Sequence, residues 1–230
     1  MSSRSSGSVE RDNPEVPAHA AMKLYYLPGT AAMAPHMALE EAGADYELVL
    51  VERDNGQVVD PPNYRELNPH DLVPTLVDGD LVLHEAAAVV MYLSDAYPDA
   101  ALAPAPGTAA RGHWYRWLTY LTNTVQPAQL NRLYPERYTT DAHGSEGVRR
   151  AGEAILEQMR AWIDGELGRN GPYLLGETFT SADLYLCMLT RWSRTLEPKW
   201  WDSPSLGSHY RRIVARPAVV RVYEQQGLEE

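Results

Sequence analysis

Two short apolar runs in the first part of the chain flank a segment with helical spacing. Residues 22–27 and 46–51 are rich in the aromatic, branched and aliphatic side chains that strands favour. Between them, Met33 and Met37, each followed by alanine, repeat at helical spacing, and Gly43 supplies the residue that commonly ends a helix. The pattern therefore predicts a βαβ unit over residues 22–51.

A hairpin follows this unit. A loop begins at Asp54, and residues 61–67, opened by two prolines, form a short predicted helix. The apolar runs 75–77 and 81–83 are joined by the Asp-Gly-Asp turn 78–80, and Asp-Gly between two such runs is a strong hairpin signal. An alanine-rich helix comes next, so the first part of the chain has the order βαβ-α-ββα.

The rest of the chain has only helical spacing. A Pro- and Ala-rich stretch, 99–107, predicts a linker between an α/β domain over 22–98 and an all-α domain over 108–230. Thr180 to Asp183 has the form of a helix capping box. The clearest helical sets are Trp114, Trp117, Leu118, Leu121 and Val125, and Ile155, Met159, Trp162, Ile163 and Leu167.

Composition narrows the class of protein. The chain has 230 residues, which suits two modest domains, and no apolar run approaches the about 20 residues of a membrane span. A net charge of −11 argues against nucleic acid as a partner. Cys187 is the only cysteine, so we expect a reducing, cytoplasmic location. Residues 1–21 are polar and lack the apolar core of a signal peptide, which predicts a disordered tail.

The stretch 68–93 combines two binding features. Pro74 cannot donate to a sheet and belongs at the start of its strand, and it forces Val73 into extended geometry. A cis bond between them would turn the Val73 N–H and C=O outward, where a bound peptide backbone could pair with them. The helix start at Glu85 and Ala86 could hold a carboxylate, and Glu85 could hold an ammonium group. Alternatively, Glu85 only complements the helix dipole and the alanines only fill the core.

This order of residues resembles the N-terminal domain of glutathione transferases, especially bacterial beta- and theta-like members. With the Phe179 to Asp183 and Arg216-Pro217 segments, the resemblance covers about residues 22–228. One departure is Ala86, because the family usually has Ser there to donate to the glutathione carboxylate. The matching residues of the stretch are Asn68, Pro69, Val73, Pro74, Leu76, Leu81, Leu83, Glu85, Ala86, Ala88, Val89, Tyr92 and Leu93.

The resemblance implies a thioredoxin-like domain, an all-helical C-terminal domain, a homodimer, and glutathione as co-substrate without a metal. By position it also implies a set of glutathione contacts, of which Val73 and Glu85 are the firmest. The set is Val73, Pro74, Glu85, Ala86, Arg53 and His70.

The thiol activator lies, in this family, near the end of the first strand. Against the beta-class pattern, the Cys and Ser positions are Ala31 and Ala32, neither of which has a donor side chain. Tyr26, Thr30 and Tyr25 remain as candidates, with strand alternation allowing only one tyrosine to face the site. The N–H groups at the helix start are a further source of stabilisation. Alternatively, the tyrosines and Thr30 have no catalytic role.

The second substrate would bind against the helical domain. Its aromatic first helix, with Trp114, Tyr115 and Trp117, predicts a pocket for a small apolar electrophile. Gln126 stands where the beta class has His. Two functions remain: a detoxifying enzyme that transfers glutathione to an electrophile, or a protein of the same fold that binds a ligand without turnover.

Overall fold

The computed structural model describes residues 21–54 and 57–229, so almost all of the predicted tail 1–21 lies outside the described residues. The elements of the first part are β1 (Met22–Tyr26), α1 (Met33–Ala42), β2 (Tyr46–Leu50), β3 (Glu52–Asp54), β4 (Gln57–Asp60), α2 (Tyr64–Leu67), β5 (Thr75–Asp78), β6 (Leu81–His84) and α3 (Ala86–Ala96). The helices of the second part are α4 (Ala109–Tyr120), α5 (Gln126–Leu133), α6 (Ser145–Asn170), α7 (Ser181–Trp192), α8 (Pro204–Val214) and α9 (Pro217–Gln226). These elements confirm the predicted fold class, a thioredoxin-like sheet unit followed by an all-helical unit.

Within the described residues, four strands form the main sheet in the order β2-β1-β5-β6. The pairing of β1 is parallel with β2 and antiparallel with β5, because an α-helical crossover joins the first pair and a longer connection reverses the chain before β5. The β5–β6 hairpin pairs Asp78 with Leu81. Gly79 in the turn has φ 56°, a backbone conformation that favours glycine.

A second, small sheet of β3 and β4 stands where the hydrophobic pattern predicted a loop. The prediction missed it because both strands are mostly polar and lack an apolar face. Residues 55–56, which connect the two strands in sequence, lie outside the described residues.

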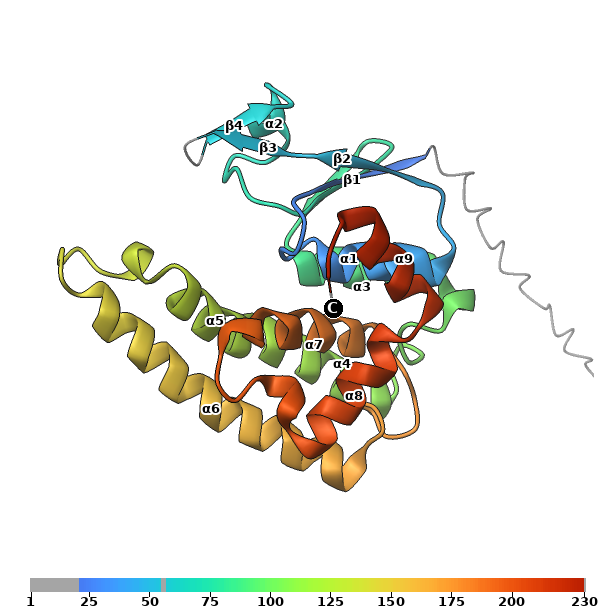
Figure 1. Cartoon of the computed structure of the whole chain (residues 1–230). Helices are drawn as coiled ribbons and strands as arrows, with labels where there is room; N and C mark the ends of the chain where they lie inside the picture. The colour runs from blue at the N-terminus through green and yellow to red at the C-terminus, as the bar shows by residue number, and fades with distance from the viewer. Residues whose placement is uncertain (1–20, 55–56, 230) are drawn as a thin grey trace, which may run out of the picture.

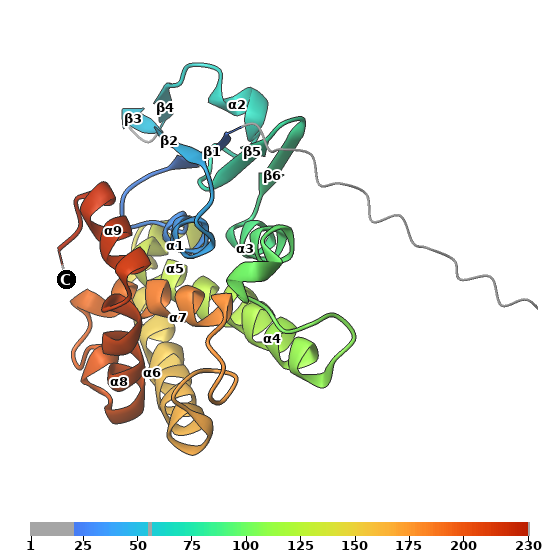
Figure 2. The same cartoon turned by 90° about the vertical axis from the view of Figure 1, so that its right-hand side faces the viewer.

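Helices cover the two faces of the main sheet unequally (Figure 2). Met22 and Leu24 of β1 are buried on the face covered by α1 and α3. On the other face, the Tyr25 ring packs against Tyr64 of α2 with the ring centroids 5.4 Å apart. Strand alternation therefore separates Tyr25 from Tyr26 across the sheet.

The helical unit is built around α7, whose residues are all buried. The predicted capping box is present at its start, where the Thr180 N–H donates to Asp183 at 2.8 Å. The other Asp183 oxygen accepts from the Leu174 N–H and contacts His209 Nε2, each at 2.9 Å. A single buried carboxylate thus ties the start of α7 to the preceding turn and to α8. None of the helices in the described ranges has the length and apolar content needed to cross a bilayer.

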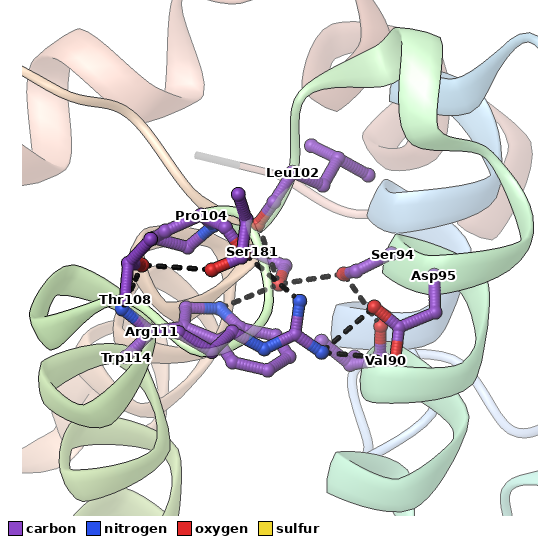
Figure 3. Close-up of polar contacts among 10 residues, drawn as sticks. Val90, Ser94, Asp95, Leu102, Pro104, Thr108, Arg111, Trp114 and Ser181 are labelled. Atoms are coloured by element: carbon purple, nitrogen blue, oxygen red, sulfur yellow. Dashed lines mark hydrogen bonds and ion pairs between the residues drawn. The ribbon is translucent and has the colours of Figure 1, made fainter. Parts of the chain in front are cut away.

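Buried hydroxyl groups join the two units (Figure 3). Ser181 Oγ lies 2.9 Å from Ser94 Oγ of α3 and donates to the Leu102 carbonyl at 3.1 Å. The Trp114 indole N–H of α4 donates to the same Ser181 hydroxyl at 3.2 Å. These contacts fix α7 against both α3 and α4.

An arginine reinforces this junction from its edge. The Arg111 side chain donates to both oxygens of Asp95, at 2.7 and 2.9 Å, and to the Pro104 carbonyl at 3.0 Å. The guanidinium therefore links α4 to the end of α3 and to the connecting segment.

We predict that Asp183→Ala lowers the free energy of unfolding by about 3–5 kcal/mol, because it leaves four buried groups that contact this carboxylate without their partner. Asp202→Ala is the matched control: Asp202 accepts the Lys199 N–H at 2.8 Å in an exposed turn, so its loss should cost about 1 kcal/mol or less. Urea denaturation of both variants measures the difference, and equal losses would contradict this account.

Candidate functional site

A cavity of about 150 Å³ lies where the sheet unit meets the helical unit. One wall comes from the loop before β5, the end of β6, the start of α3 and Ala31, which lies in the turn before α1. The opposite wall comes from α7 and from the turns that connect α4 to α5. The lining residues are Ala31, Asn68, His70, Leu72, Val73, Pro74, His84, Glu85, Ala86, Thr122, Asn123, Gln126 and Tyr185.

Five of the six glutathione contacts expected from the sequence line this cavity, and His70 is the one that comes from the loop before Val73. Val73 and Pro74, joined by a cis bond, form one edge, and Glu85 and Ala86 form the adjacent corner. Glu85 is exposed, with φ 66°, and immediately precedes α3. The first N–H groups of α3 are thus beside the cavity, where they attract negative charge.

Buried polar side chains shape the loop that carries Val73. The Asn68 amide donates to the Leu72 carbonyl at 2.7 Å, and the Tyr64 hydroxyl donates to the same carbonyl at 2.6 Å. The Asn68 oxygen accepts the His70 N–H at 3.1 Å. These bonds hold the loop that places His70 and Val73 against the cavity.

Arg53 does not join these residues at the cavity. Its guanidinium donates to the Asp71 carbonyl instead, and Arg53 is not among the residues that line the cavity. The Asp71 carboxylate in turn pairs with Arg65, whose hydrogen bond holds the pKa of that carboxyl below its usual range. Alignment alone could not foresee this, because long side chains on loops have many rotamers.

The predicted thiol activators are not gathered at the cavity, where only their neighbour Ala31 lies. Tyr25 faces α2, and the Tyr26 ring is 6.4 Å from the ring of His36 on α1. The Thr30 hydroxyl donates to the Leu27 carbonyl at 2.7 Å and accepts the Ala32 N–H at 3.5 Å. Thr30 therefore shapes the turn that presents Ala31 to the cavity.

That turn is clamped by the far end of the chain. The Gly29 N–H donates to Gln226 Oε1 of α9 at 3.0 Å, and the Gly29 carbonyl accepts from the Trp192 indole of α7 at 2.9 Å. Gly29 has φ 70°, and a Cβ there would lie 3.3 Å from Arg191 Nη1. The left-handed conformation favours glycine, and any larger residue would also require the Arg191 guanidinium to shift by a few tenths of an ångström.

His36 connects the clamp to α1. The Gln226 amide nitrogen donates to His36 Nδ1 at 2.9 Å, and His36 Nε2 donates to Gln225 Oε1 at 2.7 Å. Burial lowers the pKa of His36 to about 4, and the bond to Gln225 and the nearby Glu40 charge oppose this shift only in part. A neutral imidazole in this position holds α9 against α1.

The second wall differs from the sequence-based prediction. Trp114 and Trp117 are buried in the core, and Tyr115 is 45% exposed, so none of the three lines the cavity. Helical spacing could not separate side chains of α4 that face the core from those that face a pocket. Residues that line the cavity follow α4 in sequence. They lie in a π-helical turn, Leu121–Val125, that separates α4 from α5.

Polar side chains of this second wall were not found by sequence reasoning as site residues. Asn123 and Gln126 come from the π-helical turn and the residue after it, and Tyr185 from the buried helix α7. The Tyr185 hydroxyl donates to Gln126 Oε1 at 2.5 Å. The one signal in the sequence was Gln126 at the position of the beta-class His.

The described part of the chain gives little support for a metal site or for a cysteine nucleophile. Within it, no three His, Cys, Asp or Glu side chains gather as a metal site would require. Cys187 is fully buried, and burial raises the pKa of its thiol well above the ordinary value. Its thiol is therefore a core group rather than a nucleophile.

The fold and cavity together define the class of protein: a thioredoxin-like unit with a proline-led hairpin, joined to a helical unit that forms the second wall of the cavity. Comparison with family models agrees. Residues 20–95 match the glutathione S-transferase N-terminal domain and residues 134–217 match the C-terminal domain. The chain belongs to the glutathione S-transferase family.

Similar proteins span nearly the whole chain. Glutathione S-transferase GstA of Escherichia coli O157:H7 is 27% identical, over 90% of this chain and all of that protein. The bacterial glutathione transferase BphK, solved as a ternary complex, is 32% identical with a TM-score of 0.80, over 90% of this chain and all of its own. A sphingomonad glutathione S-transferase solved with glutathione is 29% identical with a TM-score of 0.79, at the same coverage.

We predict that His36 makes stability depend on pH between about 6.5 and about 4. The unfolded chain takes up a proton on His36 below pH 6.5, whereas the native protein does so only near pH 4. Stability is therefore lost as the pH falls through this window, by about 3 kcal/mol in total. Urea denaturation across this range, compared with His36→Gln, measures the contribution; the variant should show a shallower decline, and parallel curves would contradict the assignment.

Proposed function

We propose that this protein is an enzyme that binds glutathione in the cavity and transfers its thiolate to a small electrophile. The observation that carries the proposal is that Val73, Glu85 and the turn residue Ala31 line one cavity. A peptide-binding edge, a corner for charged groups and the start of α1 are thus within reach of one small ligand. The sphingomonad relative solved with glutathione supports the same ligand.

In the proposed binding mode, backbone groups of the protein pair with the peptide backbone of glutathione, and charged or dipolar groups bind its carboxylate and its ammonium group. The Val73 N–H and C=O pair with the backbone of glutathione as an added strand would. The first N–H groups of α3, at Ala86 and Ala87, receive a carboxylate, and Glu85 holds the ammonium group. His70 lies along the same cavity and is the remaining side-chain contact from the loop.

Activation of the thiol then depends on backbone groups rather than on a side chain at the family's usual positions. The sulfur would lie near Ala31, where the N–H groups at the start of α1 and the helix dipole favour a thiolate. Thr30 acts as a positioning residue through its bonds to Leu27 and Ala32. The thiolate forms the new carbon–sulfur bond, and the electrophile releases its leaving group or takes the electron pair.

The alternative is a protein of the same fold that binds a ligand without turnover, which the alanines at 31, 32 and 86 would suit. The two functions differ in the ionisation of bound glutathione. A calorimetric titration followed by the ultraviolet absorbance of thiolate at neutral pH separates them. Binding with added thiolate supports the enzyme, binding without it supports the alternative, and no binding at millimolar glutathione removes the enzyme.

We also propose that the protein acts as a cytoplasmic homodimer, as the family resemblance implies. Leu72, at 57% exposed, and the free edge strand β6 with Leu81 and Val82 would supply apolar area for a second copy. Sedimentation equilibrium tests the assembly, and a mass of one chain at all concentrations would exclude it.

We predict opposite effects of two neighbouring substitutions on glutathione affinity. Glu85→Gln should weaken binding about tenfold or more, because the ammonium group loses its charged partner. Ala86→Ser should tighten binding by up to about tenfold, because its hydroxyl adds a donor to the carboxylate. Isothermal titration measures both, and Asp80→Asn at the exposed hairpin tip is the control. A Glu85→Gln variant that binds as tightly as the parent would contradict the binding mode.

We predict that Thr30→Ala raises the pKa of bound glutathione's thiol, because the turn before α1 loses both of the hydroxyl's bonds. Thr30→Ser keeps the hydroxyl and should restore the parent value. The thiolate absorbance as a function of pH gives each pKa, while affinity for S-methylglutathione controls for the binding site. Equal pKa values in the Ala and Ser variants would refute a positioning role for Thr30.

A further inference from the structure

The wall of the cavity that faces Ala31 is polar. The side chains that the helical unit contributes to it are Thr122, Asn123, Gln126 and Tyr185, all of which carry hydrogen-bonding groups. The Thr122 hydroxyl already donates to the Leu118 carbonyl at 2.8 Å. The amides of Asn123 and Gln126 are therefore the groups of this wall available to an incoming molecule.

Tyr185 decides which end of the Gln126 amide faces the cavity. Burial raises the pKa of the Tyr185 hydroxyl far above its ordinary value, and the nearby charge of Glu85 adds to this. The hydroxyl therefore stays protonated and donates to Gln126 Oε1, at 2.5 Å. With its oxygen engaged, Gln126 presents its NH₂ group, and in the described part of the chain this nitrogen has no hydrogen-bond partner.

The cavity offers no permanently cationic side chain to an anionic partner for the thiolate. Neither Lys nor Arg is among the described lining residues, and in the proposed binding mode the N–H groups of α3 are occupied by the glutathione carboxylate. The aromatic side chains expected to favour an apolar molecule, Trp114 and Trp117, lie in the core. The wall thus has amide donors but neither Lys nor Arg. A neutral molecule with a hydrogen-bond acceptor fits these groups better than either an anion or an alkyl halide.

We propose that the second substrate is a neutral α,β-unsaturated carbonyl compound, whose oxygen is bound by the Gln126 amide as Tyr185 orients it. The inference rests on the proposed function, because glutathione must supply the thiolate. It makes Gln126 a catalytic residue and Tyr185 a positioning residue.

The reaction is an addition in which no group leaves. The glutathione sulfur forms a bond to the β-carbon of the alkene, and the π electrons of the carbon–carbon double bond move toward the carbonyl to give an enolate. The Gln126 N–H group donates to the enolate oxygen as its negative charge develops. A proton from water then adds to the α-carbon, which restores the carbonyl.

Two probes with the same carbon skeleton test the proposal: crotonaldehyde, which has the carbonyl oxygen, and crotyl chloride, which reacts by displacement and has none. Gln126→Leu removes the donor at similar volume, and Gln126→Glu replaces it by a carboxylate. Each should lower kcat/KM for crotonaldehyde by about tenfold to a hundredfold, the effect of one lost bond to a developing charge. For crotyl chloride the change should be less than about twofold.

Two further variants separate a local from a general effect. Tyr185→Phe should lower crotonaldehyde turnover but leave the glutathione affinity unchanged, because it only frees the Gln126 side chain to rotate. Thr124→Val, in the same π-helical turn but outside the cavity lining, should change neither substrate's kinetics. Unchanged crotonaldehyde kinetics in Gln126→Leu, or equal losses on both substrates, would overturn the inference.

The parent protein distinguishes failure of this inference from failure of the proposed function. Turnover of crotyl chloride without acceleration of the crotonaldehyde reaction overturns the inference and leaves the glutathione transferase function in place. Turnover of neither substrate, with glutathione bound, overturns both.

Discussion

The anchoring of helix α7 is the constraint on which the rest of the molecule depends. Its first residue, Ser181, bonds to α3, to the Leu102 carbonyl and to Trp114 of α4 in one buried cluster (Figure 3). Two positions further on, Asp183 ties it to α8. Because the helix is rigid, this one anchor sets both the place of Tyr185 in the cavity wall and the place of Trp192 against the Gly29 turn. The two halves of the site are thus aligned from outside the cavity.

The parts of the fold that could be predicted are those with local chemical signals. The Asp78-Gly79 turn and the Thr180–Asp183 cap act through neighbours in sequence, and both are present in the structure. The β3–β4 hairpin escaped prediction because its polar strands give no periodic signal. Trp114 and Trp117 were assigned to a pocket because helical spacing marks a buried face, and a core and a pocket bury aromatic rings alike.

In the candidate site, too, the residues that could be predicted are those close together in sequence. Val73, Pro74, Glu85 and Ala86 are close in sequence, so one motif was enough to collect them around the cavity. The bond between Tyr185 and Gln126 joins residues 59 positions apart, and no pattern of neighbours encodes it. The alanines at 31 and 32 remove side-chain donors from one wall, while the amides of the other wall add donors. Side-chain donors that the turn before α1 lacks are thus present on the opposite, helical wall of the cavity.

The clamp on Gly29 bears on how the site comes to exist during synthesis. Gln226 follows Gly29 by 197 positions, and α9 packs on α1 beside the sheet (Figure 1). On a ribosome, the sheet unit emerges long before the helix that steadies its first turn. The turn before α1 therefore reaches its final form only after nearly the whole described chain has been translated, and the nascent domain passes through a stage in which it lacks this restraint.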